Sequence, residues 1–200
     1  MSGLVGVPQF DWQPTPQKSG VVPQKPYCEQ QTLSGHVADP DAEYCPQGAW
    51  ASQLDVQPVP QADEIIVHKA ERRLYLMRHG EVLREYKVAL GLEPEGAKER
   101  AGDFRTPEGR YQLQHRNARS DYFLSIQVSY PNEDDKRRAH HNGWDPGGSI
   151  MIHGMPNNLH HPLNYYWHQD WTDGCIALSN SDMVELWLMT PDNIPIDIMP

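Results

Sequence analysis

The sequence predicts a mainly β domain of the sandwich type with one or two short helices, preceded by an extended proline-rich arm. Three observations support this prediction. Prolines are concentrated in the first 60 residues, where nine of the eighteen occur. From residue 63 onward, short apolar runs alternate with turn residues at a spacing typical of β-rich sandwiches. In one segment close to the C-terminus, apolar side chains recur at the spacing of a helix.

Residues 1–62 form the predicted arm. Proline fixes its own φ and donates no backbone hydrogen bond, so this density interrupts any long helix or central strand. Partial order is expected, because a purely disordered tail usually carries fewer aromatic residues. The aromatic residues that serve as candidate anchors are Trp12, Tyr27, Tyr44 and Trp50.

Residues 63–200 form the predicted domain, which begins with a series of short strands. Each run is apolar and bounded by turn residues, and the runs fall at 64–68, 74–77, 82–90, 111–114, 123–130 and 150–153. His79-Gly80 predicts a hairpin between the second and third runs. Thr106-Pro107-Glu108-Gly109 has the composition of a sharp turn.

One helix is predicted near the C-terminus. Ser179 can cap its first turn, and Asp182, three residues later, can complete a capping box. Pro191 ends the helix, and residues 194–198 close the chain as a final strand. The acidic and basic run at 133–138 is expected to be a solvated loop. The apolar residues that recur at helical spacing are Met183, Leu186 and Trp187.

The composition argues against two classes of partner. The net charge is -10 and the 17 basic residues are scattered, whereas nucleic-acid binding needs clustered Lys and Arg. No stretch approaches the roughly eighteen apolar residues that a membrane span requires. The first ten residues lack the basic head and apolar centre of a signal peptide. The protein therefore either stays where it is made or has lost an export segment.

The three cysteines fall into two groups. Cys28 and Cys45 lie seventeen residues apart in the arm, where a disulfide would close a loop and contribute roughly 3 kcal/mol in an oxidising compartment. Two unpaired thiols are the alternative. Cys175 lies far from both and has different neighbours, which marks it as a candidate reactive thiol.

Cys175 follows a glycine turn and precedes an apolar stretch, an arrangement that can leave a thiol beside backbone N–H groups. The amides of Gly174 and Cys175 are candidate donors to an oxyanion. A thiol with a pKa near 8.5 is mostly protonated at neutral pH, so attack needs a base. His153 ends an apolar strand and precedes Gly154, which makes it the candidate base. A structural cysteine and a buried histidine are the alternative.

Several motifs occur in a characteristic order. Leu74-Tyr75-Leu76 comes first, Gly91 ends a later strand, and the run 105–111 contains Thr-Pro-Glu-Gly-Arg-Tyr. His153-Gly154 is followed by Thr172-Asp173-Gly174-Cys175 and an apolar residue, with eighteen residues between His153 and Thr172. Together these motifs, over about residues 64–200, resemble the signature of the L,D-transpeptidase catalytic domain (YkuD/ErfK) family.

This resemblance implies an L,D-transpeptidase-like fold and an enzyme that remodels peptidoglycan in the periplasm or cell envelope without a cofactor. Cys175 would attack the carbonyl of a diamino acid in a stem tetrapeptide, with His153 as base, and expel the terminal D-Ala. The thioester would pass to a second stem, to a free D-amino acid or to water. With water, the enzyme would be a carboxypeptidase or amidase that trims or detaches wall peptides. Gly154 would orient the imidazole, and Thr172 and Asp173 would support the shape of the site.

Aromatic residues near these motifs are candidates for a groove that binds peptide or sugar. The selected substrate-binding residues are Trp144, Tyr166, Trp171, Thr172 and Asp173. Aromatic residues also dominate protein cores, so packing is the alternative role for most of them.

One residue departs from the family pattern, and two rival functions stay open. The family usually carries arginine where Ala177 stands, which leaves open how a substrate carboxylate is held. Six of the ten histidines fall between His140 and His168, so a zinc site is a rival, although no His-x-x-x-His spacing occurs. A rival of another class is a wall-binding or toxin-type module in which the arm carries the function.

Overall fold

The three-dimensional structure is a computed structural model that describes residues 58–200. The predicted arm lies almost entirely outside the described residues, as do its aromatic anchors and the predicted Cys28–Cys45 disulfide. The arm and its boundary at residue 62 therefore stay predictions. Within residues 58–200, no helix is long and apolar enough to cross a membrane.

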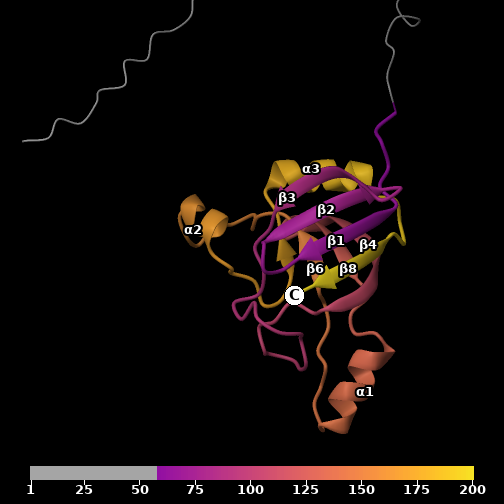
Figure 1. The fold of residues 1–200 in the computed structure, drawn as a ribbon. Helices are drawn as coiled ribbons and strands as arrows, with labels where there is room; N and C mark the ends of the chain where they lie inside the picture. The colour runs from indigo at the N-terminus through magenta and orange to yellow at the C-terminus, as the bar shows by residue number, and fades with distance from the viewer. Residues whose placement is uncertain (1–57) are drawn as a thin grey trace, which may run out of the picture. The chain divides into compact units, whose positions relative to one another are not determined.

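The described strands form one mixed eight-stranded sheet (Figure 1). Its spatial order is β3-β2-β1-β8-β4-β5-β6-β7. β1 pairs with β8 and β6 with β7 in parallel, whereas the other neighbours are antiparallel. The strands are β1 Glu64–His68, β2 Arg73–Arg78, β3 Glu81–Lys87, β4 Gly109–Ser120, β5 Phe123–Val128, β6 Met151–His153, β7 Ile176–Ala177 and β8 Pro195–Met199.

The long strand β4 joins the two halves of the sheet. Its residues 109–112 pair with β8, whereas its later residues pair with β5 through a shifting register. The far ends of the two halves also meet, because backbone bridges join Ala89 to Ala177 and Gly91 to Thr172. The sheet thus folds over on itself, and the predicted mainly β fold is confirmed.

The core lies between the two halves of the sheet. Alternate strand residues are buried, as in β1, where Ile65 and Val67 are fully buried between partly exposed neighbours. Ile152 of β6 and Ile176 of β7 belong to the same core. Full burial of such a side chain contributes about 1.5–3 kcal/mol, so packing fixes the two strands that carry the candidate site.

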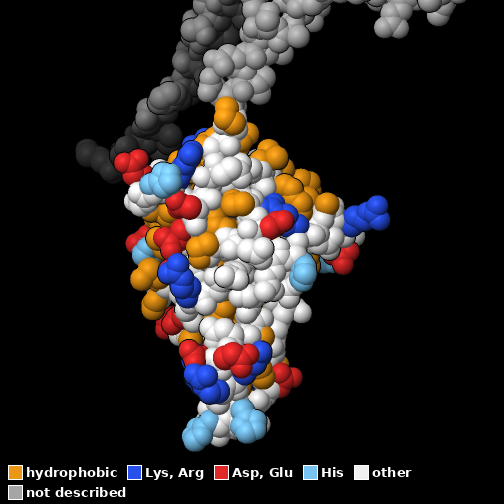
Figure 2. Space-filling view, turned by 90° about the vertical axis from the view of Figure 1, so that its right-hand side faces the viewer, with side chains coloured by type: hydrophobic (Ala, Val, Ile, Leu, Met, Phe, Trp, Pro, Cys, Tyr) orange, Lys and Arg blue, Asp and Glu red, His pale blue; other side chains and the backbone are white. Residues whose placement is uncertain are grey.

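Three short helices occur in the described residues, one more than the upper number predicted. They are α1 Glu133–His141, α2 Leu163–His168 and α3 Asn180–Met189. The expectation of a solvated loop at 133–138 is wrong, because Asn132 and Asp135 form a capping box and the charges complement the helix dipole. Figure 1 shows α1 extending away from the sheet, and Figure 2 shows charged and histidine side chains at that end.

The hairpin predicted at His79-Gly80 is confirmed, since these residues join β2 to β3. Their φ angles are 53° and 81°, as a tight two-residue turn requires. The Ser179 hydroxyl caps α3 by accepting a hydrogen bond from the Asp182 amide. The predicted final strand is confirmed as β8, which starts at Pro195 and lies inside the sheet.

Candidate active site

The turn before β7 is held by a threonine. The Thr172 hydroxyl accepts a hydrogen bond from the Gly174 amide at 3.2 Å and donates one to the Cys175 carbonyl at 2.7 Å. Gly174 has a φ of 125°, and a Cβ added there would lie 2.5 Å from the Arg105 carbonyl oxygen. Only glycine fits this close backbone approach, which fixes where Cys175 leaves the turn.

The register of β6 against β7 determines how Cys175 and His153 are placed. Ile152 pairs with Ile176 and His153 pairs with Ala177. Side chains alternate between the faces of a strand, so Cys175 and His153 emerge on the same face of the sheet. Both line one cavity of about 500 Å³.

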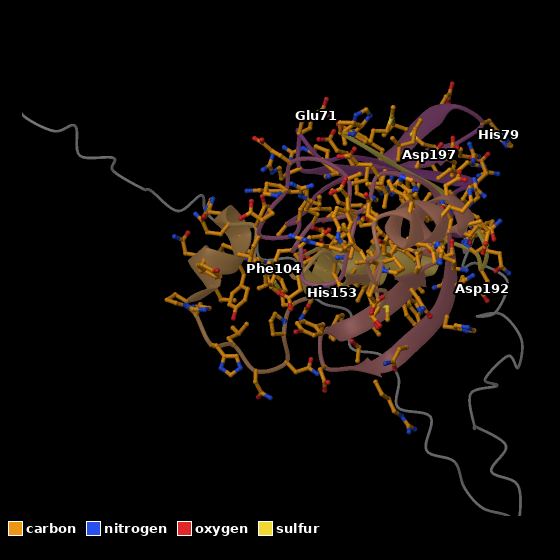
Figure 3. All side chains as sticks on the ribbon, turned by 90° about the horizontal axis from the view of Figure 1, so that it is seen from below. Glu71, His79, Phe104, His153, Asp192 and Asp197 are labelled. Carbon is orange, nitrogen blue, oxygen red and sulfur yellow. The ribbon has the colours of Figure 1, made fainter. Side chains whose placement is uncertain are left out.

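The His153 imidazole is buried, with 4% of its surface exposed, and Figure 3 shows it among densely packed side chains. Its Nδ1 lies 2.7 Å from the carbonyl oxygen of Gly154. Since a carbonyl only accepts, Nδ1 carries the proton and Nε2 keeps a free lone pair. Burial lowers the pKa of His153 to about 4, although the Gly154 hydrogen bond acts in the opposite direction. The imidazole is therefore neutral at pH 7.

Gly154 allows α3 to approach the histidine closely. A Cβ at this position would lie 2.6 Å from the Asn180 side-chain oxygen and 3.1 Å from Cβ of Phe123. The same Asn180 oxygen accepts a hydrogen bond from the Met155 amide. The chain after β6 is thus fixed, which holds the Gly154 carbonyl in place against Nδ1.

The Cys175 side chain is half-buried at the edge of the cavity. Its thiol donates a hydrogen bond to the Ser149 carbonyl at 3.6 Å. Burial raises the pKa of Cys175, as does the charge of Asp173, while a hydrogen bond with the Met151 backbone and the charge of Lys98 act against this rise. The resting pair is therefore a neutral thiol beside a neutral imidazole.

The two candidate oxyanion donors differ in the structure. The Gly174 amide already donates to the Thr172 hydroxyl, so it is engaged within the turn. The Cys175 amide has no hydrogen-bond acceptor among residues 58–200. The Cys175 amide is consequently the one of the two that is free to bind a developing oxyanion.

The predicted substrate-binding residues separate into two groups. Trp171, Thr172 and Asp173 line the cavity that holds Cys175. Trp144 does not line it and instead lies under the Arg100 guanidinium, 5.3 Å from the ring centroid. Tyr166 lines two adjoining cavities rather than this one.

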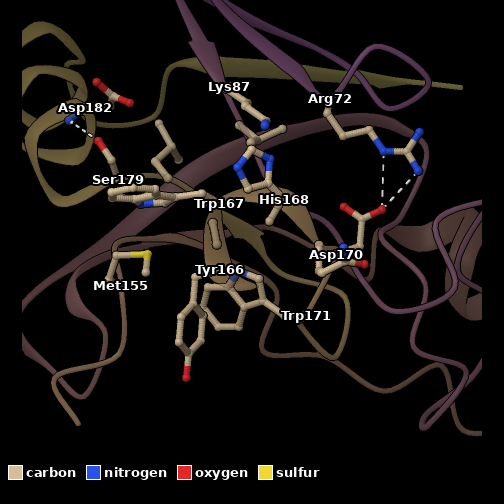
Figure 4. Close-up of a pocket in the computed structure, with 15 residues that line it drawn as sticks. Arg72, Lys87, Met155, Tyr166, Trp167, His168, Asp170, Trp171, Ser179 and Asp182 are labelled. Atoms are coloured by element: carbon tan, nitrogen blue, oxygen red, sulfur yellow. Dashed lines mark hydrogen bonds and ion pairs between the residues drawn. The ribbon is translucent and has the colours of Figure 1, made fainter. Parts of the chain in front are cut away.

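Trp171 separates the cysteine cavity from its neighbours. Its ring lies 5.6 Å from the His153 ring and 5.1 Å from that of Tyr166. A cavity of about 530 Å³ lies beyond Trp171 and contains the ion pair between Arg72 and Asp170 (Figure 4). The Trp171 indole N–H is buried and has no acceptor in the described part of the chain.

The predicted zinc alternative finds no support among residues 58–200, which contain no group of three or more His, Cys, Asp or Glu placed to hold a metal ion. His161 instead stacks on Tyr165, with ring centroids 4.4 Å apart. His161 therefore belongs to an aromatic cluster beside the cavity, whereas His140 and His141 lie in the last turn of α1.

Comparison with known proteins identifies the family. The YkuD L,D-transpeptidase catalytic domain matches residues 62–198. The chain belongs to the L,D-transpeptidase catalytic domain family. Members of this family act on peptidoglycan.

Two relatives of this L,D-transpeptidase domain are informative. YafK of Escherichia coli (strain K12), provisionally named an L,D-transpeptidase, is 33% identical over 129 residues, which are 62% of this chain and 45% of YafK. The crystal structure of the helical cell shape determining protein Pgp2 from Campylobacter jejuni shares 27% identity and a TM-score of 0.52, over 68% of this chain and 46% of Pgp2. The chain thus spans about half the length of these relatives.

Sequence reasoning did not assign a role in the site to Arg119 and Ser149, which line the cavity of this L,D-transpeptidase domain together with Tyr122. The Tyr122 ring lies 4.6 Å from the ring of His153. Arg119 and Tyr122 lie at the turn between β4 and β5, about thirty residues or more before the motifs that contain His153 and Cys175. A lone arginine in a polar turn carries no recognisable signal.

Proposed function

We propose that this chain catalyses cysteine-dependent acyl transfer on peptidoglycan stem tetrapeptides. The observation that supports the proposal most strongly is the shared cavity, where the Cys175 thiol and the buried, neutral His153 imidazole emerge from one face of the sheet. Similarity to Pgp2, which by its name determines helical cell shape, supports a wall polymer as substrate. The family's action on peptidoglycan supports the periplasm or cell envelope as the location of the proposed activity.

The neutral resting pair defines the first chemical step. As the Cys175 sulfur attacks the carbonyl of the diamino acid, Nε2 of His153 takes the thiol proton, and negative charge develops on the carbonyl oxygen. The free Cys175 amide is placed to stabilise that charge. The imidazolium then returns the proton to the amine of the terminal D-Ala as the C–N bond breaks, which leaves a thioester on Cys175.

Proton transfer must accompany attack, because both groups start neutral. The Gly154 carbonyl accepts a hydrogen bond from Nδ1–H throughout, so it supports the imidazolium while that charge exists. The second half-reaction reverses these roles, since His153 deprotonates the incoming amine or water. An amine from a second stem or a free D-amino acid gives transpeptidation or exchange, whereas water gives hydrolysis.

The decisive experiment is mass spectrometry of a purified disaccharide-tetrapeptide incubated with the protein, with and without a free D-amino acid. We expect loss of D-Ala, or its replacement by the added amino acid, with wild-type protein and with neither Cys175→Ala nor Cys175→Ser. Product masses distinguish transfer from hydrolysis. An intact substrate and no acyl-enzyme with folded wild-type protein would overturn the proposal and favour the wall-binding alternative.

A further inference from the structure

Arg119 lies at the end of β4 and lines the cavity that holds Cys175 and His153. Its side chain is exposed and has no carboxylate or carbonyl partner among residues 58–200. Several other arginines of the described chain are paired with carboxylates, as Arg72 is with Asp170 and Arg116 with Asp192. Arg119 therefore presents a guanidinium to which residues 58–200 supply no partner.

The backbone that carries Arg119 is firmly held. The Arg119 amide donates to the side-chain oxygen of Asn117 at 2.8 Å. Asn157, from the segment after β6, donates to the Ser120 carbonyl at 2.8 Å and accepts from the Phe123 amide at 3.0 Å. These bonds tie the β4–β5 turn to the segment that follows the His153 strand, so the backbone from which Arg119 projects is held relative to the reacting groups.

The charge of the cavity makes this guanidinium significant. Among the described residues that line the cavity, Arg119 is the one with a permanent positive charge, whereas Asp121 and Asp173 are acidic and His153 is neutral. Lys98 is buried and already paired with Asp103. A substrate carboxylate entering this cavity meets two like charges, so it needs Arg119 to be bound favourably.

The residue at position 177 offers no alternative cation. Ala177 is buried, with 3% of its surface exposed, and it lines the adjoining cavity on the other side of Trp171. A carboxylate beside Cys175 can therefore be recognised from the β4–β5 turn and not from β7. The planar guanidinium fits this task because it binds a carboxylate through two parallel hydrogen bonds.

We propose that Arg119 binds a carboxylate of the donor stem peptide and thereby selects substrates in which that carboxylate is free. This inference rests on the proposed function. A stem tetrapeptide offers two such groups: the terminal carboxylate of D-Ala and, where the diamino acid is also a diacid, its side-chain carboxylate. Both share the chemistry that Arg119 recognises.

The test combines protein and substrate charges. Wild type, Arg119→Gln and Arg119→Lys are assayed on the parent tetrapeptide, its terminal amide and its side-chain amide. We expect Arg119→Gln to lower kcat/KM on the parent by about 10- to 100-fold, as loss of a charged hydrogen bond implies. The kcat/KM of the wild type should be lower by a similar factor on one of the two amidated peptides. On that peptide, Arg119→Gln should have the same kcat/KM as the wild type. The peptide that behaves this way identifies the carboxylate.

Arg110→Gln is the matched control, because Arg110 is an exposed arginine of the same strand that does not line the cavity. Arg119→Lys should recover part of the lost kcat/KM, since lysine restores the positive charge but cannot form the two parallel hydrogen bonds of a guanidinium. An equal loss on all three peptides, or no loss on the parent, would overturn the inference. If wild type leaves every peptide intact, calorimetric binding of the same peptides to Cys175→Ala and Cys175→Ala/Arg119→Gln still decides whether Arg119 holds a carboxylate.

Discussion

Acidification should destabilise the fold through His153. The ordinary pKa of a histidine is 6.5, and burial lowers that of His153 to about 4. Between these values the unfolded chain binds a proton that the folded chain does not, so stability falls as the pH drops. The full contribution is present above pH 6.5 and is lost by about pH 4. A difference of about 2.5 pKa units corresponds to about 3 kcal/mol.

The measurement is urea unfolding followed by tryptophan fluorescence at several pH values between 7 and 4. Other groups also titrate in this range, so the comparison is between wild type and His153→Gln, with His115→Gln as control because His115 is exposed on β4. We expect wild type and His115→Gln to lose about 3 kcal/mol more than His153→Gln over this interval. Parallel curves for all three proteins would refute a buried, neutral His153.

Three further predictions concern the framework around the site. Gly174→Ala should lower thermal stability more than Gly80→Ala, because both glycines have positive φ but only the Gly174 Cβ would meet backbone; equal effects would contradict the close approach. Asn132→Ala should cost about 1 kcal/mol by removing the capping box of α1, and hydrogen exchange should report this loss within α1. Lys69→Met should cost about 3–5 kcal/mol in chemical denaturation, since it leaves Glu108 and two carbonyls without their partner. Lys136→Met, at an exposed pair, should change stability by less than about 0.5 kcal/mol.

The strands were predicted best from the sequence, because burial of one face makes apolar and polar residues alternate along a strand, and this pattern can be recognised within a few residues. The sequence also predicted the β2–β3 hairpin, where His79-Gly80 suits positive φ. The helix α1 was missed because it has few apolar residues and is stabilised by caps and charges. The Asn132 and Asp135 capping box was nevertheless readable in the sequence.

The candidate site was predictable only in part. The motifs singled out Cys175 and His153, and the register of β6 and β7 supplies their common face. Local sequence did not reveal that Thr172 engages the Gly174 amide, because that depends on turn geometry. It also did not reveal Arg119, whose place beside the cavity depends on the shifting register of β4 against β5 and on the hydrogen bonds made by Asn157.

The neutral resting state of the Cys175 thiol also bears on its chemical durability. Peroxides and disulfides react with the thiolate, so a thiol whose pKa is raised by burial is oxidised slowly. Deprotonation is deferred until a bound substrate draws the proton to His153. Burial keeps the Cys175 thiol protonated, so attack on a substrate needs a base. The same burial slows oxidation of the thiol to a sulfenic acid when no substrate is bound.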